Sequence, residues 1–583
     1  MRNRGPDHQA DQSFSIGDFR VCLLHSRLSI IDLDPRSNQP FTIGSTTIVY
    51  NGEIYNYVEL REQLVARGIG LRTQSDTEVL LHYYRLYGED CLEHFEGMWA
   101  FAIFDSSKGS LFLSRDRFAE KPLYYLTNTD GFYFGSEIKF LKELTSKNLR
   151  VNRNHLMRHL AHGYKALYKT DETYYENVRE LKYAQHIIVT PGKVGRPQRY
   201  WHPRCEVEDS MTLNDAIEGC RERLFESVRI RLRSDVPLAF CLSGGVDSAS
   251  LVSIAAKEFN AKLETFSIID SDERYNEEDN IMATVRDLDC PHNLLEIPQE
   301  EALPRLQKLI AYHDAPIATI SYYVHSLISK SLHEKGYRVS FSGTSADELF
   351  TGYYDHFILH LNEVRNRSDY DDHLVNWKEH LGKFVRNPDL KNPDLYLENP
   401  NFRDHVFDGS KELKDYLKIS FKEPFSEEFF TQNLLRNRMM NELFHEVTPV
   451  ILHEDDLNSM FYSIENRSPF LDRHLLKFAC SIPSQHLIRK GYGKYILREA
   501  LNGVLNDQVR LDRRKKGFNA SINSMIDLQN EEVRSYLLDP KAEVFEMIDR
   551  SKIEQLINQF PLPNHFSKFI FNFINARIFL EMN

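Results

Sequence analysis

The segment LAFCLSGGVDSASLVSIAA, residues 238–256, constrains the fold of this chain more than any other stretch. Its apolar start is typical of a buried β-strand that ends at Leu242, and a helix is predicted from about Val246 onward. Between them lies the loop Ser243-Gly244-Gly245. Two glycines allow the backbone to approach an anion closely, and the start of the helix presents free N–H groups. The pattern therefore predicts a phosphate-binding loop at the end of a strand.

Asp247, inside the same motif, narrows the kind of phosphate site. A carboxylate repels a bare phosphate, but it is favourable where Mg²⁺ bridges carboxylate and phosphate oxygens. Ser243 and Ser248 add hydroxyl donors. The loop lacks the Gly-Lys-Ser/Thr of a Walker A motif, which disfavours P-loop kinases and GTPases, and it resembles the pyrophosphate loop of ATP pyrophosphatases. The alternative is a glycine turn that binds nothing, but the ordered motif behind a buried strand favours nucleotide binding.

At 583 residues, the chain is too long for one ordinary domain. Residues 1–195 contain short apolar or aromatic runs bounded by turn residues, with helical patterns between them, which predicts layered α and β structure. From residue 213 onward, strand patterns alternate with helices, as in a parallel sheet. Proline, glycine and charge concentrate at 190–210, so we predict two domains, 1–195 and 196–583. The stretch 360–430 is predicted to form a lid or an inserted helical subdomain.

Net charge and cysteine content disfavour several classes of protein. The formal net charge is -13, so a broad nucleic-acid or anionic-membrane surface is not expected. No apolar run is long enough to span a bilayer, and the polar residues 1–20 do not read as a signal peptide. The seven cysteines are scattered without a CxxC pair or a disulfide framework, and Cys22 lies in a run typical of a buried strand. A reducing, cytoplasmic location is expected.

Further ordered motifs lie in each predicted domain. After SGGVDS, the second domain carries VSFSGTSADELFTGYYDHF at 339–357, SIENRSPFLD at 463–472, GYGKYILREAL at 491–501 and RRKKGF at 513–518. The first domain carries RGPD, HSRLSIIDL, VYNGEIYNY, QSDTEVLLHYY and RDRFAEKPLYY. In this order the motifs resemble the glutamine-dependent asparagine synthetase family over nearly the whole chain, with least support across 360–430.

The resemblance implies a fold and a reaction. The implied fold combines α/β and α+β structure in two domains. An N-terminal-nucleophile αββα sandwich, the class II glutamine amidotransferase domain, is followed by a parallel-sheet α/β ATP-pyrophosphatase (PP-loop) domain. In the implied reaction, ATP converts a carboxylate to an acyl-adenylate and pyrophosphate, and ammonia released from glutamine attacks the adenylate. The chain is thus expected to be a carbon–nitrogen ligase that uses ATP and Mg²⁺.

Five residues of the first domain match the family's glutamine pocket. Arg27 would clamp the α-carboxylate through its two-pronged guanidinium, and Asp76 would hold the α-amino group. The Asn51 side chain and the Gly52 N–H would form the oxyanion hole, and Glu53 would complete the wall. Taken one at a time, Arg27 could be a surface arginine, Asp76 a helix N-cap, and Asn51-Gly52 a hairpin turn. Their presence together in family order favours the pocket.

The second domain supplies the residues that match the family's ATP and metal sites. The implied nucleotide contacts are Leu242, Ser243, Gly244, Gly245, Asp247, Ser248, Ile268, Ser342 and Gly343. Asp247 and Asp347 are the implied Mg²⁺ ligands, because a hard cation prefers oxygen donors. Ile268 matches a position that contacts adenine. Lys494 matches the lysine that neutralises charge on the transferring phosphate; outside its motif it would read as a solvated lysine on a helix surface.

The chain departs from the family pattern at its start. The family nucleophile is an N-terminal cysteine whose own α-amine acts as its base. Here residue 2 is Arg, no cysteine lies near it, and Met1 matches an internal methionine that precedes RGPD. As written, the chain is not expected to hydrolyse glutamine. We favour a start codon assigned too far downstream over a true loss, because the rest of the glutamine pocket is intact.

A second departure lies in the motif SGTSADELF. Asparagine synthetases carry a glutamate where Thr344 stands, and that glutamate is thought to accept a proton as ammonia attacks. A threonine cannot act as a carboxylate base, but its hydroxyl can orient a nucleophile or contact a different acceptor. Thr344 and Lys494 are therefore the candidate catalytic residues. Aspartate is favoured only slightly as acceptor over a uronic-acid sugar of a surface polysaccharide. In SIENRSPFLD, Arg467 and Asp472 are expected to form a buried ion pair without a catalytic role.

Two classes of function stay open. The first is an amide-forming ligase acting on small molecules, with glutamine or ammonia as nitrogen donor and a carboxylate as acceptor. The second is a non-catalytic relative that binds nucleotide or a partner protein. The missing cysteine and Thr344 support this second class, whereas the intact Asp347 and Lys494 argue against it. Nucleic-acid binding is disfavoured by the net charge of -13. Family members often dimerise, so a homodimer is expected by analogy.

Overall fold

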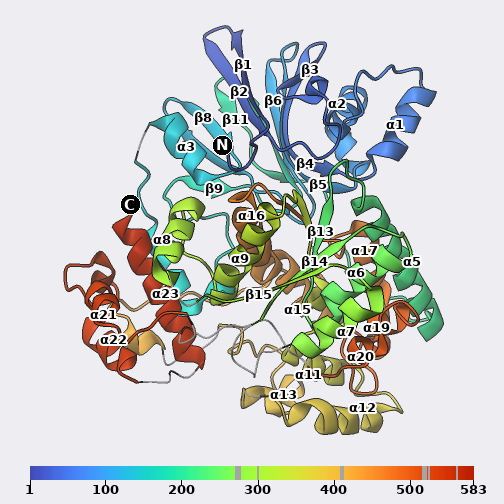
Figure 1. Cartoon of the computed structure of the whole chain (residues 1–583), viewed down its shortest axis with the longest axis vertical. Coiled ribbons are helices and arrows are strands. Elements are labelled where there is room, and N and C mark those ends of the chain that lie inside the picture. Colours follow the sequence, from blue (N-terminus) through green and yellow to red (C-terminus); the bar gives the residue numbers. More distant parts are fainter. Residues whose placement is uncertain are drawn as a thin grey trace.

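The structure is a computed structural model of the chain (Figure 1). It describes all of residues 1–583 except 147, 270–276, 299–300, 386, 408–412, 515–521, 523–524, 560–561 and 563, so most of the RRKKGF motif lies outside the described residues. Antiparallel sheets extend up to Arg199, and a parallel sheet begins at Leu238. This change of sheet type confirms the predicted fold class. Within the described part of the chain, no helix has both the length and the apolar character that crossing a bilayer requires.

The amino-terminal domain is built from antiparallel strands in three sheets. The largest has the order β11-β10-β6-β5-β4-β3 with β12 beside β10, a second pairs β1 with β2, and a third has the order β8-β7-β9. The strands are β1 (His8–Ile16), β2 (Phe19–Arg27), β3 (Phe41–Ile43), β4 (Thr46–Ile54), β5 (Gly97–Asp105), β6 (Ser110–Arg115), β7 (Tyr124–Asn128), β8 (Gly131–Gly135), β9 (Val178–Glu180), β10 (Gln185–Thr190), β11 (Lys193–Val194) and β12 (Gln198–Arg199). The helices are α1 (Tyr57–Ala66), α2 (Asp76–Tyr87), α3 (Ile138–Thr145) and α4 (Arg153–His162).

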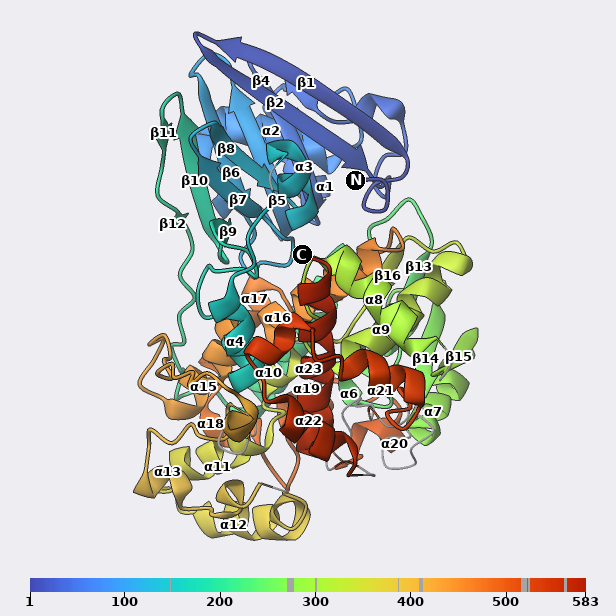
Figure 2. The same cartoon turned by 90° about the vertical axis from the view of Figure 1, so that its left-hand side faces the viewer.

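Apolar side chains on both faces of the large sheet place it inside the domain. Successive residues of a strand point to opposite faces, so Ile48 and Ile103 pack against α1 and α2 on one side. On the other side, Val49 and Ala102 pack against apolar residues of the smaller sheets. Helix α3 lies against β7 and β8 and forms the outermost layer there. The resulting order of helix, sheet, sheet and helix is the expected αββα sandwich, which lies above the second domain in Figure 2.

A five-stranded parallel sheet with the order β15-β14-β13-β16-β17 forms the centre of the carboxyl-terminal domain. Its strands are β13 (Leu238–Cys241), β14 (Glu264–Ile269), β15 (His292–Glu296), β16 (Val339–Phe341) and β17 (Glu465–Arg467). The chain starts in the middle, moves outward to β15, and returns to the other side of β13 to form β16. In such sheets ligands bind outside the carboxyl ends of the strands where the order reverses. The reversal places the SGGVDS loop beside the SGTSADELF loop.

Helices cover both faces of this sheet and build the rest of the domain. They are α5 (Leu213–Arg231), α6 (Val246–Lys257), α7 (Glu278–Leu288), α8 (Ala302–His313), α9 (Ile320–Glu334), α10 (Ala346–Phe350), α11 (Tyr354–Glu363), α12 (Tyr370–Trp377), α13 (Leu395–Glu398), α15 (Leu434–Asn441), α16 (Thr448–Met460), α17 (Arg473–Ser481), α18 (Ser484–Leu487), α19 (Tyr495–Ala500), α20 (Asp507–Arg510), α21 (Glu531–Leu537), α22 (Arg550–Ile557) and α23 (Asn564–Glu581). Phe240 and Phe341 of the sheet pack in one core with α5 and α6, whereas Ala239 and Phe266 pack in another with α9 and α23.

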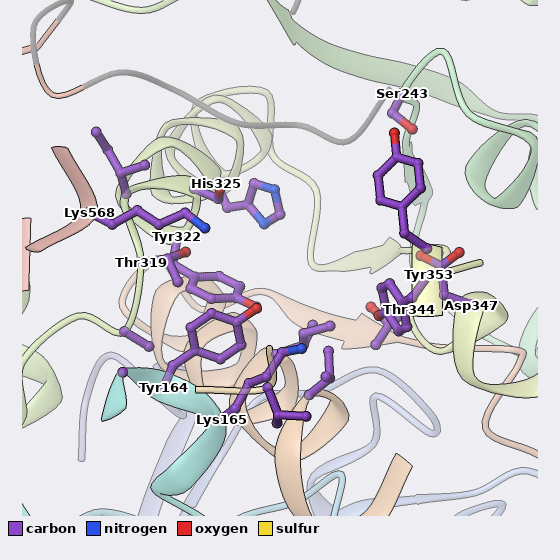
Figure 3. Close-up of a pocket in the computed structure, with 18 of the residues that line it drawn as sticks. Tyr164, Lys165, Ser243, Thr319, Tyr322, His325, Thr344, Asp347, Tyr353 and Lys568 are labelled. Atoms are coloured by element: carbon purple, nitrogen blue, oxygen red, sulfur yellow. The ribbon is translucent and has the colours of Figure 1, made fainter. Parts of the chain in front are cut away.

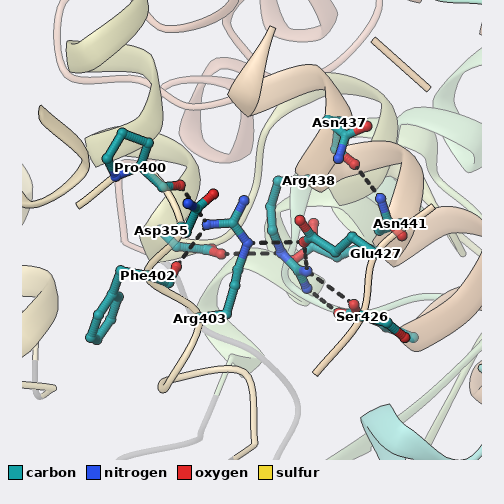
Figure 4. A network of polar contacts seen from close by, with 12 residues as sticks. Asp355, Pro400, Phe402, Arg403, Ser426, Glu427, Asn437, Arg438 and Asn441 are labelled. Carbon is teal, nitrogen blue, oxygen red and sulfur yellow. Dashed lines mark hydrogen bonds and ion pairs between the residues drawn. The ribbon is translucent and has the colours of Figure 1, made fainter. Parts of the chain in front are cut away.

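A buried ion-pair network anchors the segment that leads out of the stretch 360–430 (Figure 4). The Arg438 guanidinium donates to Glu427 at 2.7 Å and to Glu446 at 3.0 Å, and it lies 3.3 Å from Glu442. Arg403 donates to the same oxygen of Glu427 at 3.0 Å. The stretch itself holds short helices and irregular connections at the end of the molecule far from the first domain (Figure 2). Its description as an inserted subdomain, like the domain boundary near residue 195, stays a prediction.

The segment after α3 crosses from the first domain to the second. Helix α4 packs against α23. Arg158 of α4 forms an ion pair with Glu423 at 2.7 Å. Near the start of the chain, Arg4 forms an ion pair at 2.6 Å with Asp456 of α16, in the second domain. Parts of the first predicted domain therefore contribute directly to the core of the second.

The structure corrects two expectations for individual residues. Asp472 does not pair with Arg467; it lies 3.3 Å from Arg231, while Arg467 pairs with Glu465 at 3.0 Å. The reason is local, because Asp472 also caps α17 and its carboxylate is directed to the amides of that helix. Cys22 is exposed rather than buried, because β1 and β2 form a sheet of their own with one face open.

The structure also corrects the expectation that the scattered cysteines form no disulfide. A disulfide joins Cys205, in the connection between the domains, to Cys480 of α17. The two residues are separated by 275 positions, so no spacing rule could have paired them. The disulfide tethers the interdomain connection to the second domain.

Candidate active site

The SGGVDS loop lies at the carboxyl end of β13, and α6 begins directly after it. The Ser243 amide donates to the Ser248 hydroxyl oxygen at 2.9 Å, so the loop folds back onto the first turn of the helix. The Gly244 amide donates to Glu277 Oε2 at 3.1 Å. A Cβ on Gly244 would lie 2.6 Å from the Glu277 Cβ, so this position requires glycine. By contrast, a Cβ on Gly245 would meet only the Ser243 hydroxyl oxygen at 3.4 Å.

The ammonium group of Lys494 lies between the two aspartates that the sequence analysis proposed as metal ligands. Its nitrogen is 2.7 Å from both Asp247 oxygens and 2.5 Å from Asp347 Oδ1. Burial alone would lower the pKa of Lys494, but attraction to the two carboxylates outweighs burial and raises that pKa. Lys494 precedes α19 and is only 7% exposed, so it is not a solvated lysine on a helix surface.

The loop after β16 forms the neighbouring wall. The Ser342 amide donates to the Arg467 carbonyl oxygen at 3.0 Å, and the Ser342 hydroxyl oxygen lies 3.0 Å from Thr344 Oγ1. A Cβ on Gly343 would lie 2.8 Å from the Ser248 amide nitrogen. The two loops therefore touch, and only glycine allows this approach. As a result, Thr344 lies beside the candidate nucleotide site.

A cavity of about 2240 Å³ opens over these loops (Figure 3). The sequence-predicted residues that line it are Leu242, Ser243, Asp247, Ser248, Ile268, Ser342, Gly343, Thr344 and Asp347. Gly244, Gly245 and Lys494 are not among the lining residues, but Gly244 and Lys494 contact Glu277 and Asp247, which do line the cavity. Figure 3 shows Tyr164, Lys165 and Tyr322 across the cavity from Ser243 and Asp347. The sequence analysis did not single out these residues, and two of them come from the first predicted domain.

Sequence reasoning also missed the residues that hold the loops in place. The Asn280 side-chain amide donates to the Gly244 carbonyl oxygen at 3.1 Å, and the Asn466 amide donates to the Ser342 hydroxyl oxygen at 2.9 Å. Asn466 lies within SIENRSPFLD, so that motif was a signal for it. Glu277 and Asn280 follow β14 in the sequence, within an acidic run that shows no motif of its own.

The candidate glutamine site gathers at the ends of β2 and β4 and the start of α2. Asp76 is buried and accepts hydrogen bonds from the Tyr50 hydroxyl at 2.9 Å and the Ile54 amide at 3.0 Å. Burial raises the pKa of Asp76 in spite of these bonds. Arg27 is buried as well, and its guanidinium donates to the Asp34 carbonyl oxygen at 3.1 Å. Arg27 is therefore no surface arginine, and the N-cap of α2 is Ser75 rather than Asp76.

The Asn51-Gly52 pair lies within β4 rather than in a hairpin turn. Gly52 has a φ of 146°, and a Cβ there would lie 2.1 Å from the Met98 carbonyl oxygen, so the position requires glycine. The Asn51 side-chain amide donates to the Ser136 hydroxyl oxygen at 3.3 Å. The three simple alternatives for these positions thus disagree with the structure, although the glutamine-binding roles themselves stay proposals.

Glu53 connects this site to the second domain. Its Oε1 lies 3.9 Å from Arg467 Nη2, across the domain interface. Burial, followed by repulsion from Asp76 and Glu465, raises the pKa of Glu53 well above its ordinary value. The wall of the candidate glutamine pocket therefore touches β17, which leads directly to the second site.

Comparison with protein families covers both halves of the chain. Residues 1–201 match the family described as a glutamine amidotransferase domain, and residues 219–570 match the family described as asparagine synthase. The chain belongs to the asparagine synthase family. Members of this family are ATP-dependent, and membership makes the chain a ligase of the glutamine-dependent, amide-forming type.

Alignments with individual relatives cover most of this asparagine synthase family member. Glutamine-hydrolysing asparagine synthetase 1 of Bacillus subtilis is 31% identical over 575 residues, which cover 95% of this chain and 88% of the relative. Asparagine synthetase 3 of the same organism is 27% identical over 590 residues, with 96% and 89% covered. Amidase chry2 of Gibberella zeae is 27% identical over 571 residues, with 87% and 82% covered. The relatives thus carry more than one activity in their names.

Proposed function

We propose that this asparagine synthase family member forms an amide from a carboxylic acid through an acyl-adenylate. ATP adenylates the carboxylate, pyrophosphate leaves, and ammonia attacks the adenylate to give the amide and AMP. The observation that carries this proposal is the convergence of Asp247, Asp347 and Lys494 beside the SGGVDS loop. A buried ammonium group between two partly exposed carboxylates, at the carboxyl end of a parallel sheet, suits a site that stabilises a departing polyphosphate.

Mg²⁺ fits the residues that are present. Asp247 and Asp347 both lie within 2.7 Å of one ammonium group, so their carboxylates converge on a common point. A pair of oxygen donors arranged in this way suits a hard cation. Asp247 and Asp347 would hold the ion, which would neutralise charge on pyrophosphate. Lys494 would add positive charge close to the phosphate that is transferred.

The remaining nucleotide residues take supporting roles in this proposal. The SGGVDS loop and the start of α6 would bind the phosphates, chiefly through N–H groups of the first helical turn, because the amides of Ser243 and Gly244 already donate to Ser248 and Glu277. Ile268, which lines the cavity at the end of β14, would contact adenine. Ser342 and Gly343 would close over the nucleotide from β16, and Leu242 would pack beneath it.

We propose aspartate as the acceptor, with a uronic-acid sugar as the alternative. Thr344 lines the cavity and lies 3.0 Å from Ser342, so its hydroxyl is placed to orient ammonia or the acceptor. Nitrogen would come from glutamine held by Arg27, Asp76, Asn51, Gly52 and Glu53, or from free ammonia. A homodimer and a cytoplasmic location stay predictions.

ATP–pyrophosphate exchange tests the proposal. Purified protein is incubated with ATP, Mg²⁺, labelled pyrophosphate and one acid at a time, and amide formation is then measured with ammonia and with glutamine. We expect exchange that depends on one class of acid and is abolished by Asp247→Asn. Lack of exchange with every acid, together with full biological activity of Asp247→Asn, would instead support the non-catalytic nucleotide-binding relative.

A further inference from the structure

Lys165 reaches the synthetase cavity from the first half of the chain. It belongs to the short turn Tyr164–Ala166, which follows α4 and Gly163. Buried Ala166 and Leu167 anchor this turn, and Lys169 pairs with Glu446 at 2.8 Å just beyond it. Figure 3 shows the Lys165 side chain extending into the cavity, across from Thr344 and Asp347. The backbone of Lys165 is thus fixed by buried neighbours, and its half-buried side chain lines the cavity.

The charge of Lys165 is not used within the part of the chain that the structure describes. Its ammonium group makes no hydrogen bond or ion pair there. Burial alone would lower the pKa of Lys165, but its surroundings, chiefly Tyr164 and Glu442, raise the pKa, so the side chain stays charged. Arg403, another cation at the cavity, differs, because it pairs with Glu427 at 3.0 Å. The three N–H donors of the Lys165 ammonium group therefore stay available to an anionic ligand.

We propose that Lys165 binds a second anionic group of the acceptor, separate from the carboxylate that becomes the amide. This inference rests on the proposed function, because it places the acceptor between Thr344 and Lys165. The carboxylate to be adenylated lies at the Thr344 side, next to the nucleotide loops. The second anion lies at the far wall, beside Tyr164 and Tyr322. Lys165 is therefore a specificity-determining residue for the acceptor.

The proposal selects among acids by their charge. Aspartate satisfies it, because its second carboxylate is available to Lys165. A free uronic acid, with one carboxylate, does not satisfy it, whereas a uronic acid linked to a nucleoside diphosphate does. The cavity of about 2240 Å³ exceeds an ordinary ligand pocket of about 300–1,000 Å³, so it can hold ATP together with either acid.

Matched pairs of acids and variants test the proposal. Exchange kinetics are measured with aspartate against β-alanine, which lacks only the second carboxylate, and with nucleotide-linked against free glucuronic acid. The variants are Lys165→Ala and Lys165→Arg, with Lys383→Ala as control, because Lys383 lines the same cavity but is exposed. We expect Lys165→Ala to raise KM for the dianionic acid about 10- to 100-fold, the usual range for a charge-assisted hydrogen bond, with little change in kcat.

Lys165→Arg should restore most of the affinity, since it keeps the charge, and Lys383→Ala should behave as the wild type. The KM of the singly charged acid should not depend on Lys165. A KM for the dianionic acid that is unchanged in Lys165→Ala, or a rise shared equally by both acids of a pair, would overturn this inference alone. If the wild type shows no exchange with any acid, the proposed function fails and this inference fails with it.

Discussion

The ammonium nitrogen of Lys494 lies 2.7 Å from both carboxylate oxygens of Asp247. Asp347 approaches the same nitrogen from the other side at 2.5 Å. Two carboxylates and one ammonium leave one negative charge in a partly buried site at the carboxyl end of the sheet. In the proposed function, this site would hold a divalent cation, which would then attract pyrophosphate.

Removal of the Lys494 charge should strongly slow adenylation. We expect Lys494→Met to lower the rate of ATP–pyrophosphate exchange about 100- to 1,000-fold, because a charge aimed at the reacting phosphate is lost. Lys490→Met is the matched control: Lys490 is exposed, and its φ of 51° is close to the 56° of Lys494, so both substitutions carry the same backbone cost. Equal exchange rates in the two variants would contradict the assigned role of Lys494.

The two glycines of the SGGVDS loop should differ in their tolerance of a side chain. In Gly244→Ala the new Cβ would meet the Glu277 Cβ at 2.6 Å, so we expect a loss of about 1–3 kcal/mol in the free energy of unfolding. In Gly245→Ala the nearest atom is 3.4 Å away, so stability should stay close to that of the wild type. Urea unfolding measures both. A similar loss in both variants would mean that the contact with Glu277 does not constrain the loop.

The buried network around Arg438 should contribute strongly to stability. Arg438→Met would leave Glu427, Glu442 and Glu446 without their shared cation, so we expect a loss of about 3–5 kcal/mol in the free energy of unfolding. Arg36→Met removes an exposed ion pair with Asp34 and should leave stability close to that of the wild type. Comparable melting temperatures for the two variants would rule out the expected contribution of the buried network.

Glu446 should make stability depend on acid pH. Although burial would raise the pKa of Glu446, Arg438 and then Lys169 outweigh burial and lower the pKa to about 2. The folded value lies below the 4.5 of the unfolded chain, so the stabilisation is fully present above pH 4.5 and is lost as the pH falls from 4.5 toward 2. The difference corresponds to about 3 kcal/mol at neutral pH.

We therefore expect Glu446→Gln to be destabilised most at pH 7, and its difference from the wild type to shrink below pH 4.5. Unfolding free energies between pH 7 and pH 3.5 measure this trend. The exposed Glu62→Gln is the control, and it should differ little from the wild type over the whole range. A difference for Glu446→Gln that stays constant with pH would contradict the proposed ionisation of this residue.

Local patterns predicted the elements that carry the strongest motifs. Strand β13 and helix α6 lie where the sequence placed them, because the apolar run that ends at Leu242 and the helical pattern from Val246 are both clear. Strands β15 and β17 were missed. The first is a half-exposed edge strand, and the second is only three residues long, so neither shows a readable pattern.

The sequence by itself determined the fold class, the family and several of the residues that line the candidate nucleotide site, because these depend on local strand, loop and helix patterns and on ordered motifs. Only the tertiary structure decided which charges meet. Lys494 joins Asp247 across 247 positions, and Asp472 pairs with Arg231 instead of Arg467. Lys165 enters a cavity that is lined mostly by residues of the other domain. Such contacts depend on how parallel strands cross over and on which buried charges find partners, and neither is encoded in local spacing.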